Sequence, residues 1–157
     1  MLSQTSEYAL RAMACLAYSD EGLTTTPTLA EMTKVPSNYL AKVLQSLAQA
    51  ELIIGRRGVG GGYRLARPAD QISMLDIVNA IDPIERIRTC PLELSTHGPA
   101  LCPLHRALDG AASDLIKRFG STTLHDLISD PGASKPLCDT RSNGNAAAGV
   151  TISARPD

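Results

Sequence analysis

The chain has 157 residues, enough for one domain with an extension, and its net charge of −1 at pH 7 neither favours nor excludes a nucleic-acid partner. Tryptophan is absent and aromatic residues make up 3% of the chain, so the core has to consist of Leu, Ile, Val and Ala, which suits helix packing better than a β-sandwich. No stretch approaches the roughly 20 apolar residues that span a bilayer, and no signal peptide is recognisable. We therefore expect a cytoplasmic protein with no membrane partner, in which cysteines are thiols or ligands rather than disulfides.

The predicted elements begin with a helix over residues 3–18. After a loop rich in Thr and Gly, Thr28 and Glu31 have the spacing of a capping box, which predicts a short helix from residue 28. Pro36 breaks this helix, because proline disfavours helical backbone in the residue before it. Ser37 is then expected to cap a longer helix over 37–50. Its apolar residues fall on one stripe and are expected to be buried: Leu40, Val43, Leu44 and Leu47.

The next segment, LIIGRRGVGGGYRLARP, predicts a β-hairpin with strands at 52–57 and 63–66 and a glycine-rich tip. A nucleotide-binding loop is excluded, because such glycines have to lead into a helix and these lead into a strand. The region between residues 35 and 67 also has a local basic surplus, with Glu51 as the only acid. Its basic residues are Lys42, Arg56, Arg57, Arg64 and Arg67.

In the second half, Ser73 and Asp76 predict another short helix, which runs to about residue 81. Pro103 favours the first turn of a helix and predicts a long helix that opens at 102. Thr123 is expected to cap a final short helix, and the composition of 131–157 indicates a disordered tail. The apolar residues of the long helix step by three or four, as in a short coiled coil: Leu101, Leu104, Leu108, Ala112, Leu115 and Phe119.

This order of elements predicts a winged helix-turn-helix fold, mainly α with a small β-hairpin. The helix from Ser37 would enter the major groove, which is about 12 Å wide, and the hairpin would contact phosphates or the minor groove. The alternative is a core helix with a solvated face beside an ordinary hairpin, and the clustered arginines favour DNA binding over it. The expected DNA-binding residues are Thr28, Ser37, Asn38, Tyr39, Lys42, Gln45, Arg56, Arg57, Gly60 and Gly61.

The segments SEYALRAMACLA, SNYLAKVLQSLAQA and LIIGRRGVGGGYRLARPADQISMLDIVNAID resemble the Rrf-type family of winged helix-turn-helix transcriptional regulators, which includes IscR, NsrR and CymR. The resemblance covers about residues 1–129, and the RGxGGGYxLA wing is a specific part of it. It implies a homodimer joined by the helix after Cys102, which binds a roughly palindromic operator in double-stranded DNA. By the family's pattern, the recognition helix and Arg57 of the wing contact the DNA.

The resemblance also gives a role to the stretch CPLELSTHGPALCPLH at 90–105. Family members with a [2Fe–2S] or [4Fe–4S] cluster bind it through three cysteines between the wing and the dimer helix. The first and last of these match Cys90 and Cys102, and His105 matches a position where one branch uses a histidine. The middle position falls at Thr96, which cannot supply a thiolate, and His97 is its neighbour. Some members complete the cluster with an acid from the partner's first helix, and Glu7 stands near that position.

The resemblance and the residues together suggest four parts. These are a winged helix-turn-helix domain at 1–83, a sensor or cofactor loop at 84–101, a dimerisation helix with a short terminal helix at 102–130, and the tail at 131–157.

The residues alone leave the chemistry of this stretch open. Thiolates and imidazoles suit an iron–sulfur cluster or zinc, but the spacing of Cys90, Cys102 and His105 is too irregular for a zinc motif. A direct thiol switch and two buried thiols without a cofactor are the alternatives. Cys15 is assigned to the core, and Cys138 receives no role.

We therefore expect a dimeric regulator, most simply a repressor, that responds to a cluster or to the thiol state of Cys90 and Cys102. The alternatives are a regulator without a cofactor that senses a metabolite or partner protein, and a winged-helix adaptor that binds no DNA. No acid–base pair, activated nucleophile or phosphate loop indicates an enzyme.

Overall fold

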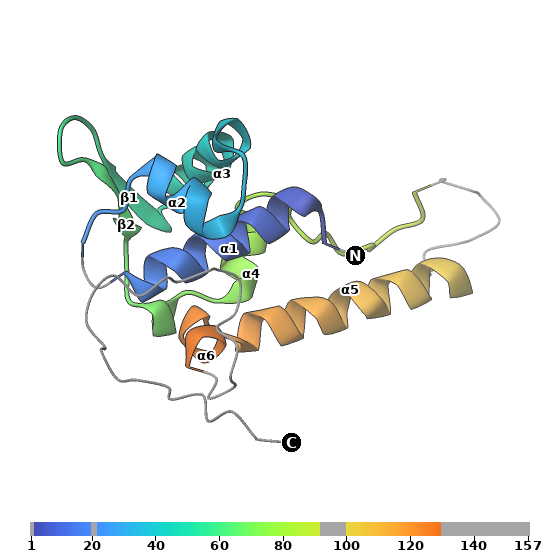
Figure 1. Ribbon diagram of the computed structural model, residues 1–157. Helices are drawn as coiled ribbons and strands as arrows, with labels where there is room; N and C mark the ends of the chain where they lie inside the picture. The colour runs from blue at the N-terminus through green and yellow to red at the C-terminus, as the bar shows by residue number, and fades with distance from the viewer. Residues whose placement is uncertain (1, 20–21, 92–99, 130–157) are drawn as a thin grey trace, which may run out of the picture.

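The computed structural model describes residues 2–19, 22–91 and 100–129. The predicted fold class is confirmed, since the described part is mainly helical with one two-stranded antiparallel sheet. Figure 1 shows α3 and the hairpin on one side of α1, and α5 and α6 on the other. The predicted tail at 131–157, with Cys138, lies outside the described residues. The elements are α1 (Gln4–Tyr18), α2 (Thr26–Thr33), α3 (Ser37–Gln49), β1 (Ile53–Arg56), β2 (Gly62–Leu65), the 3-10 helix η1 (Ala69–Gln71), α4 (Met74–Asn79), α5 (Pro103–Ser121) and α6 (Leu124–Ile128).

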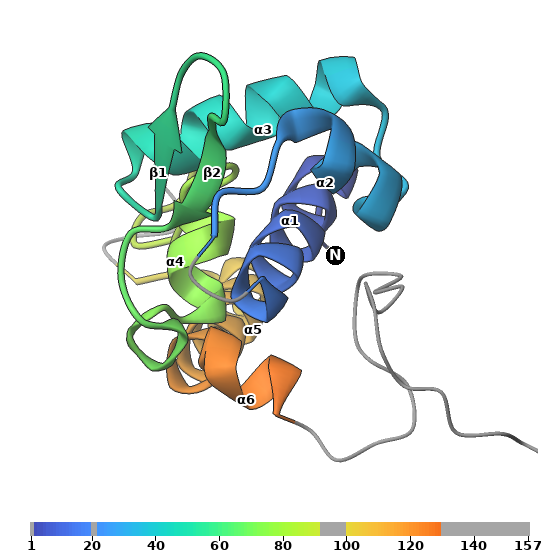
Figure 2. The same cartoon turned by 60° about the vertical axis from the view of Figure 1, so that its left-hand side comes forward.

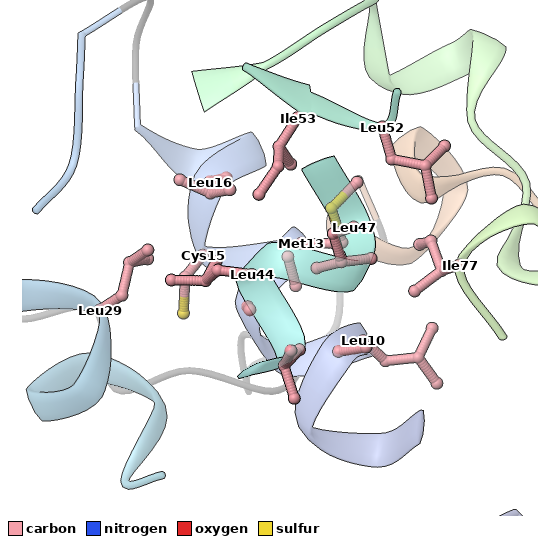
Figure 3. Packing of buried hydrophobic residues seen from close by; sticks show 14 of the residues in the cluster. Leu10, Met13, Cys15, Leu16, Leu29, Leu44, Leu47, Leu52, Ile53 and Ile77 are labelled. Carbon is pink, nitrogen blue, oxygen red and sulfur yellow. The ribbon is translucent and has the colours of Figure 1, made fainter. Parts of the chain in front are cut away.

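Helix α1 is the centre of the hydrophobic core. It contacts α2, α3, α4, α6 and β2, and its side chains are buried on several faces. Alanines at three of the buried positions keep the helix narrow and let its neighbours approach closely. Figure 3 shows Leu10 and Met13 of α1 among leucines of α3 and Ile77 of α4. Cys15 has no exposed surface, which confirms its assignment to the core.

The starts of α2 and α3 differ from the prediction. Thr25 caps α2 by accepting a hydrogen bond from the backbone N–H of Thr28, so Thr28 lies inside the first turn and forms no capping box with Glu31. Pro27, also in that first turn, has the backbone angle that a helix start requires. At α3 the cap is Pro36, whose carbonyl accepts bonds from the N–H groups of residues 39 and 40. Ser37 is therefore the first helical residue and not the cap.

Helix α3 confirms the predicted amphipathic pattern. Leu40, Val43, Leu44 and Leu47 are buried against the core, while the polar residues of the other face are exposed. Burying four aliphatic side chains fixes the rotation of α3 about its axis, so the polar face has to point away from the domain.

Backbone hydrogen bonds join the hairpin to the loop before α2 at one residue of β2. The strands pair with Gly55 opposite Tyr63, and Tyr63 also exchanges two backbone hydrogen bonds with Thr24, at 2.8 and 2.9 Å. A Cβ atom added to Gly62 would lie 2.6 Å from the carbonyl oxygen of Thr24, so glycine is required for this close approach. Each end of the observed strands lies one residue from the predicted end.

Helices α4 and α6 begin side by side. Ser73 and Thr123 each form a capping box, with Asp76 and Asp126 respectively, as their sequences predict. The two cap residues also pair as a β-bridge, in which the N–H of Leu124 donates to the carbonyl of Ile72 at 2.7 Å. The end of α5 is therefore joined to the core through backbone bonds.

Helix α5 is largely exposed. None of its 19 residues, all of which lie in the described part of the chain, is fully buried. Figures 1 and 2 show that its C-terminal end meets α4 and α6, while Figure 1 shows its N-terminal half extending away from the core. Leu104 is 64% exposed and Leu108 50%, which is unusual for leucines on one helix face. No helix among the described residues is long and apolar enough to cross a membrane.

We expect Thr123→Ala to lower the free energy of unfolding by about 1 kcal/mol, the usual effect of removing a helix cap. The substitution removes the acceptor of the Asp126 N–H bond, which is 3.0 Å long. Urea denaturation followed by circular dichroism measures the change. Thr5→Ala is the control, because Thr5 is exposed in the first turn of α1, where Ser3 is the cap. Equal loss in both variants would contradict the role of Thr123.

Candidate nucleic-acid interface and thiol segment

The outer face of α3 is a row of exposed polar side chains. Asn38, Lys42 and Gln45 recur at spacings of four and three, which places them on one face, with Tyr39 beside them and 56% exposed. The helix contains no acidic residue. Such a face offers donors and acceptors to base edges and repels no phosphate.

A groove of about 640 Å³ lies between α3 and the hairpin. It brings Gln45 of the helix together with Arg56 and Arg57 of the hairpin, three of the predicted DNA-binding residues. Sequence reasoning did not foresee the other lining residues, although Ala41, Ala48 and Gln49 stand at helical spacing from Gln45. The groove is lined by Ala41, Gln45, Ala48, Gln49, Gly55, Arg56, Arg57 and Tyr63.

The tip of the hairpin depends on glycine. Gly58 and Gly60 have φ values of 93° and 72°, which side chains rarely allow, and the N–H of Gly61 donates to the carbonyl of Gly58 at 2.9 Å. A Cβ atom on Gly61 would collide with the backbone of Arg56 and Gly58. The glycines thus make a narrow, turned tip whose backbone can approach a ligand closely.

Two further predicted DNA-binding residues lie at helix starts. Thr28 is exposed in the first turn of α2, where its hydroxyl is 2.8 Å from that of Thr25. Ser37 is exposed as the first residue of α3. Both stand where backbone N–H groups attract phosphate oxygens.

The thiol segment is only partly described. Cys102 is the N-cap of α5, and its Sγ lies 3.3 Å from Nδ1 of His105. Cys90 is half-buried in the segment that follows α4, whereas Thr96 and His97 lie outside the described residues. Within the described ranges, no group of three His, Cys, Asp or Glu residues could hold a metal ion. The donor chemistry of Cys102 and His105 fits a cluster or zinc, but a complete ligand set needs further donors.

Glu7 is engaged within its own helix. Its carboxylate accepts two hydrogen bonds from Arg11, at 2.9 and 2.5 Å, and Arg11 also donates to the carbonyl of Thr33. The carboxylate of Glu7 is thus already hydrogen-bonded to Arg11. As a metal ligand it would interact with Arg11 and the metal at the same time.

An ion pair that the sequence did not reveal joins the segment after α4 to α5. Arg86 donates two hydrogen bonds to the carboxylate of Asp109, both 2.6 Å long, and a third to the hydroxyl of Ser113 at 3.1 Å. The backbone N–H of Ile87 also donates to Asp109, at 2.9 Å. The hydrogen bonds from Arg86 lower the pKa of Asp109, and the same contact raises the pKa of Arg86.

Comparison with known proteins decides the family. A profile of the Rrf2 family, described as "Iron-dependent Transcriptional regulator", matches residues 2–130. This chain belongs to the Rrf2 family. The predicted family is therefore confirmed, and Rrf2 proteins are DNA-binding transcriptional regulators and not enzymes.

Solved structures of Rrf2 proteins have the same fold. CymR (YrzC), the global cysteine regulator of B. subtilis, is 26% identical, with a TM-score of 0.66 over 81% of this chain and 95% of that one. The oxidized form of Staphylococcus aureus CymR is 29% identical, with a TM-score of 0.61 over 81% and 94%. IscR of T. potens, at 24% identity, has a TM-score of 0.68 over 83% and 87%. The winged helix is thus shared across the Rrf2 proteins compared.

Proposed function

We propose that this Rrf2 protein is a homodimeric repressor that binds a roughly palindromic operator and responds to the state of Cys90 and Cys102. The observation that carries the DNA-binding part is the exposed, acid-free face of α3 beside a groove that contains two arginines of the hairpin. A helix on a domain surface with hydrogen-bonding residues outward fits the major groove, and a basic hairpin at its side fits the adjoining backbone.

The proposed contacts divide by chemistry. Asn38, Tyr39, Lys42 and Gln45 reach base edges from α3, because their side chains are exposed on its outer face. Thr28 and Ser37 bind phosphates at the helix starts. In the hairpin, Arg56 and Arg57 contact phosphates or the minor groove, while Gly60 and Gly61 let the backbone approach the DNA closely.

We expect Lys42→Ala and Arg57→Ala each to weaken operator binding by about 1–3 kcal/mol. Fluorescence anisotropy at physiological and at raised salt measures the affinity, and the wild type should lose affinity steeply as salt rises. Lys117→Ala is the control, because Lys117 is exposed on α5, on the opposite side of the domain from α3. If Lys42→Ala and Arg57→Ala both bind the operator with wild-type affinity, the assigned contacts are wrong. If the wild-type protein binds no DNA at any salt concentration, the adaptor alternative is favoured.

The dimer is proposed from α5. In the single chain, Leu104 and Leu108 expose much of their apolar surface on a helix that extends from the core. Apolar surface of this kind is stabilised when a second copy covers it, and the spacing by three or four residues suits helix pairing. Two copies joined through α5 present two α3 helices, which read half-sites about one turn of DNA apart.

Leu108→Lys is expected to shift the protein from dimer to monomer, since it places a charge within the apolar row. Light scattering after size-exclusion chromatography measures the mass, and operator affinity should fall with it. Lys117→Glu is the matched control, because Lys117 is nine residues from Leu108, which places it on the opposite face of a helix with about 3.6 residues per turn. A dimer that survives Leu108→Lys would contradict pairing through α5.

The response is proposed to arise at Cys90, Cys102 and His105. A further ligand would be His97, the neighbour of Thr96 at the middle position, or Glu7 of a second copy, which stands near the acid that some family members use. The description of the family as iron-dependent supports a cluster, and the oxidized form of S. aureus CymR supports the thiol alternative. An iron–sulfur cluster would supply a centre whose redox state or loss can be sensed. Cys102 caps α5, so a change in its bonding alters the start of the helix that sets the spacing of the two α3 helices.

Anaerobic purification from iron-replete cells should give a coloured protein with matching iron and sulfide, visible by absorption spectroscopy and elemental analysis. Cys90→Ala and Cys102→Ala should each remove most of the iron, because each removes a thiolate ligand, while Cys138→Ala should keep it. A colourless, iron-free wild type would contradict the cluster. Mass spectrometry of the oxidised protein then tests the thiol switch, which requires the two Cα atoms to approach within about 7 Å.

A further inference from the structure

Helix α5 has a second, polar stripe beside its apolar row. Between residues 103 and 111 only His105 and Asp109 are partly buried, and every other residue is exposed. Cys102 and Ser113 continue this pattern at spacings of three and four, which puts all four side chains on one face of the helix. The segment after α4 contacts this face, since Arg86 and Ile87 donate to Asp109 and Arg86 to Ser113.

The Arg86–Asp109 contact has more hydrogen bonds and a less exposed carboxylate than an ordinary surface ion pair. Exposed pairs usually contribute little, because two long side chains have to be held in place. Here the guanidinium binds the carboxylate through two parallel bonds, a backbone N–H adds a third, and the Asp109 side chain is only 16% exposed. Apart from this ion pair, the N–H of Ile84 donates a hydrogen bond to the side chain of Asn79 at 3.1 Å, which fixes the start of the same segment.

The segment from Ile87 to Cys90 and the helix from Asp109 back to Cys102 cover similar distances. Cys90 follows Ile87 by three residues, which span about 10 Å when extended. Cys102 precedes Asp109 by seven residues, which rise about 10 Å along a helix. A segment that leaves the ion pair towards the start of α5, as residues 87–91 do in Figure 1, can therefore bring Cys90 level with Cys102.

We infer that the Arg86–Asp109 ion pair is the positioning element that holds the Cys90 segment along α5 and makes Cys90 and the Cys102–His105 pair one site. The inference rests on the proposed function, in which both thiols act together. Release of the ion pair lets the segment leave the helix face, so the two thiols separate although neither is altered. Arg86 and Asp109 touch no ligand themselves and act through the backbone of residues 87–90.

The test uses the full-length protein, reduced and treated with chelator, and compares Asp109→Asn and Arg86→Lys with the wild type. Asp109→Asn removes the negative charge with almost no change of shape, and Arg86→Lys keeps the positive charge but loses the planar fork. Asp114→Asn is the matched control, because Asp114 is an exposed carboxylate elsewhere on α5. A short bifunctional maleimide probes the proximity of Cys90 and Cys102, and a cross-link within one protomer leaves the protomer mass after denaturation.

In the wild type and Asp114→Asn, the cross-link between Cys90 and Cys102 should form readily. In Asp109→Asn and Arg86→Lys, its yield should fall several-fold while the alkylation rate of Cys90 rises. Cys15 is fully buried, so its alkylation reports opening of the whole domain and should stay unchanged in all variants. If the ion pair only stabilised the fold, its removal would raise the alkylation rates of Cys15 and Cys90 together. That result would overturn the inference.

Equal cross-link yields in Asp109→Asn and Asp114→Asn would also overturn it, and they would leave operator binding through Lys42 and Arg57 untouched. Conversely, failure of the operator-binding experiments would contradict the proposed function without changing the cross-link yields. The two results are therefore separable.

Discussion

The burial of α1 is the constraint on which the rest of the structure depends. Since α1 is in contact with α2, α3, α4, α6 and β2, each of these elements takes its position from one helix. The small side chains of α1 allow this crowding, and Met13 and Leu10 fill the space between α3 and α4 (Figure 3). The orientation of α3 is thereby set from inside the domain, so the direction of its exposed polar face follows from packing and not from contacts of the polar side chains themselves.

The core holds the two ends of α5 in different ways. Leu124 has no exposed surface, and the bridge between Ser73 and Thr123 attaches the end of α5 to α4. Nearer its start, α5 is joined to the segment after α4 by the hydrogen bonds of Arg86 and Ile87 to Asp109. The contacts near the start of α5 can therefore change while the core stays packed.

The sequence was sufficient for features that arise from neighbouring residues. The apolar spacing in α3, the caps Ser73 and Thr123, and the glycine-tipped hairpin all follow from local rules, and the structure has them. The predicted cap of α2 was wrong by three residues because Thr25 and Thr28 both satisfy the capping preference. The predicted cap of α3 was wrong by one residue because Pro36, which offers no side-chain acceptor, occupies the cap in place of Ser37. The Arg86–Asp109 contact was missed because the two residues are separated by 23 positions and only the return of α5 brings them together. The ligand set could not follow from spacing either, since donors from residues 92–99 or another chain depend on tertiary placement.

The two stripes of α5 also bear on how such a regulator can change over generations. The apolar row and the Cys102–His105–Asp109–Ser113 face occupy different sides of one helix. Substitutions at Cys102 or His105 therefore change a different face of α5 from the one that carries the exposed leucines Leu104 and Leu108. In the regulator proposed above, the residues that sense a signal could therefore change over evolution while the residues proposed for dimer formation and operator binding stay the same.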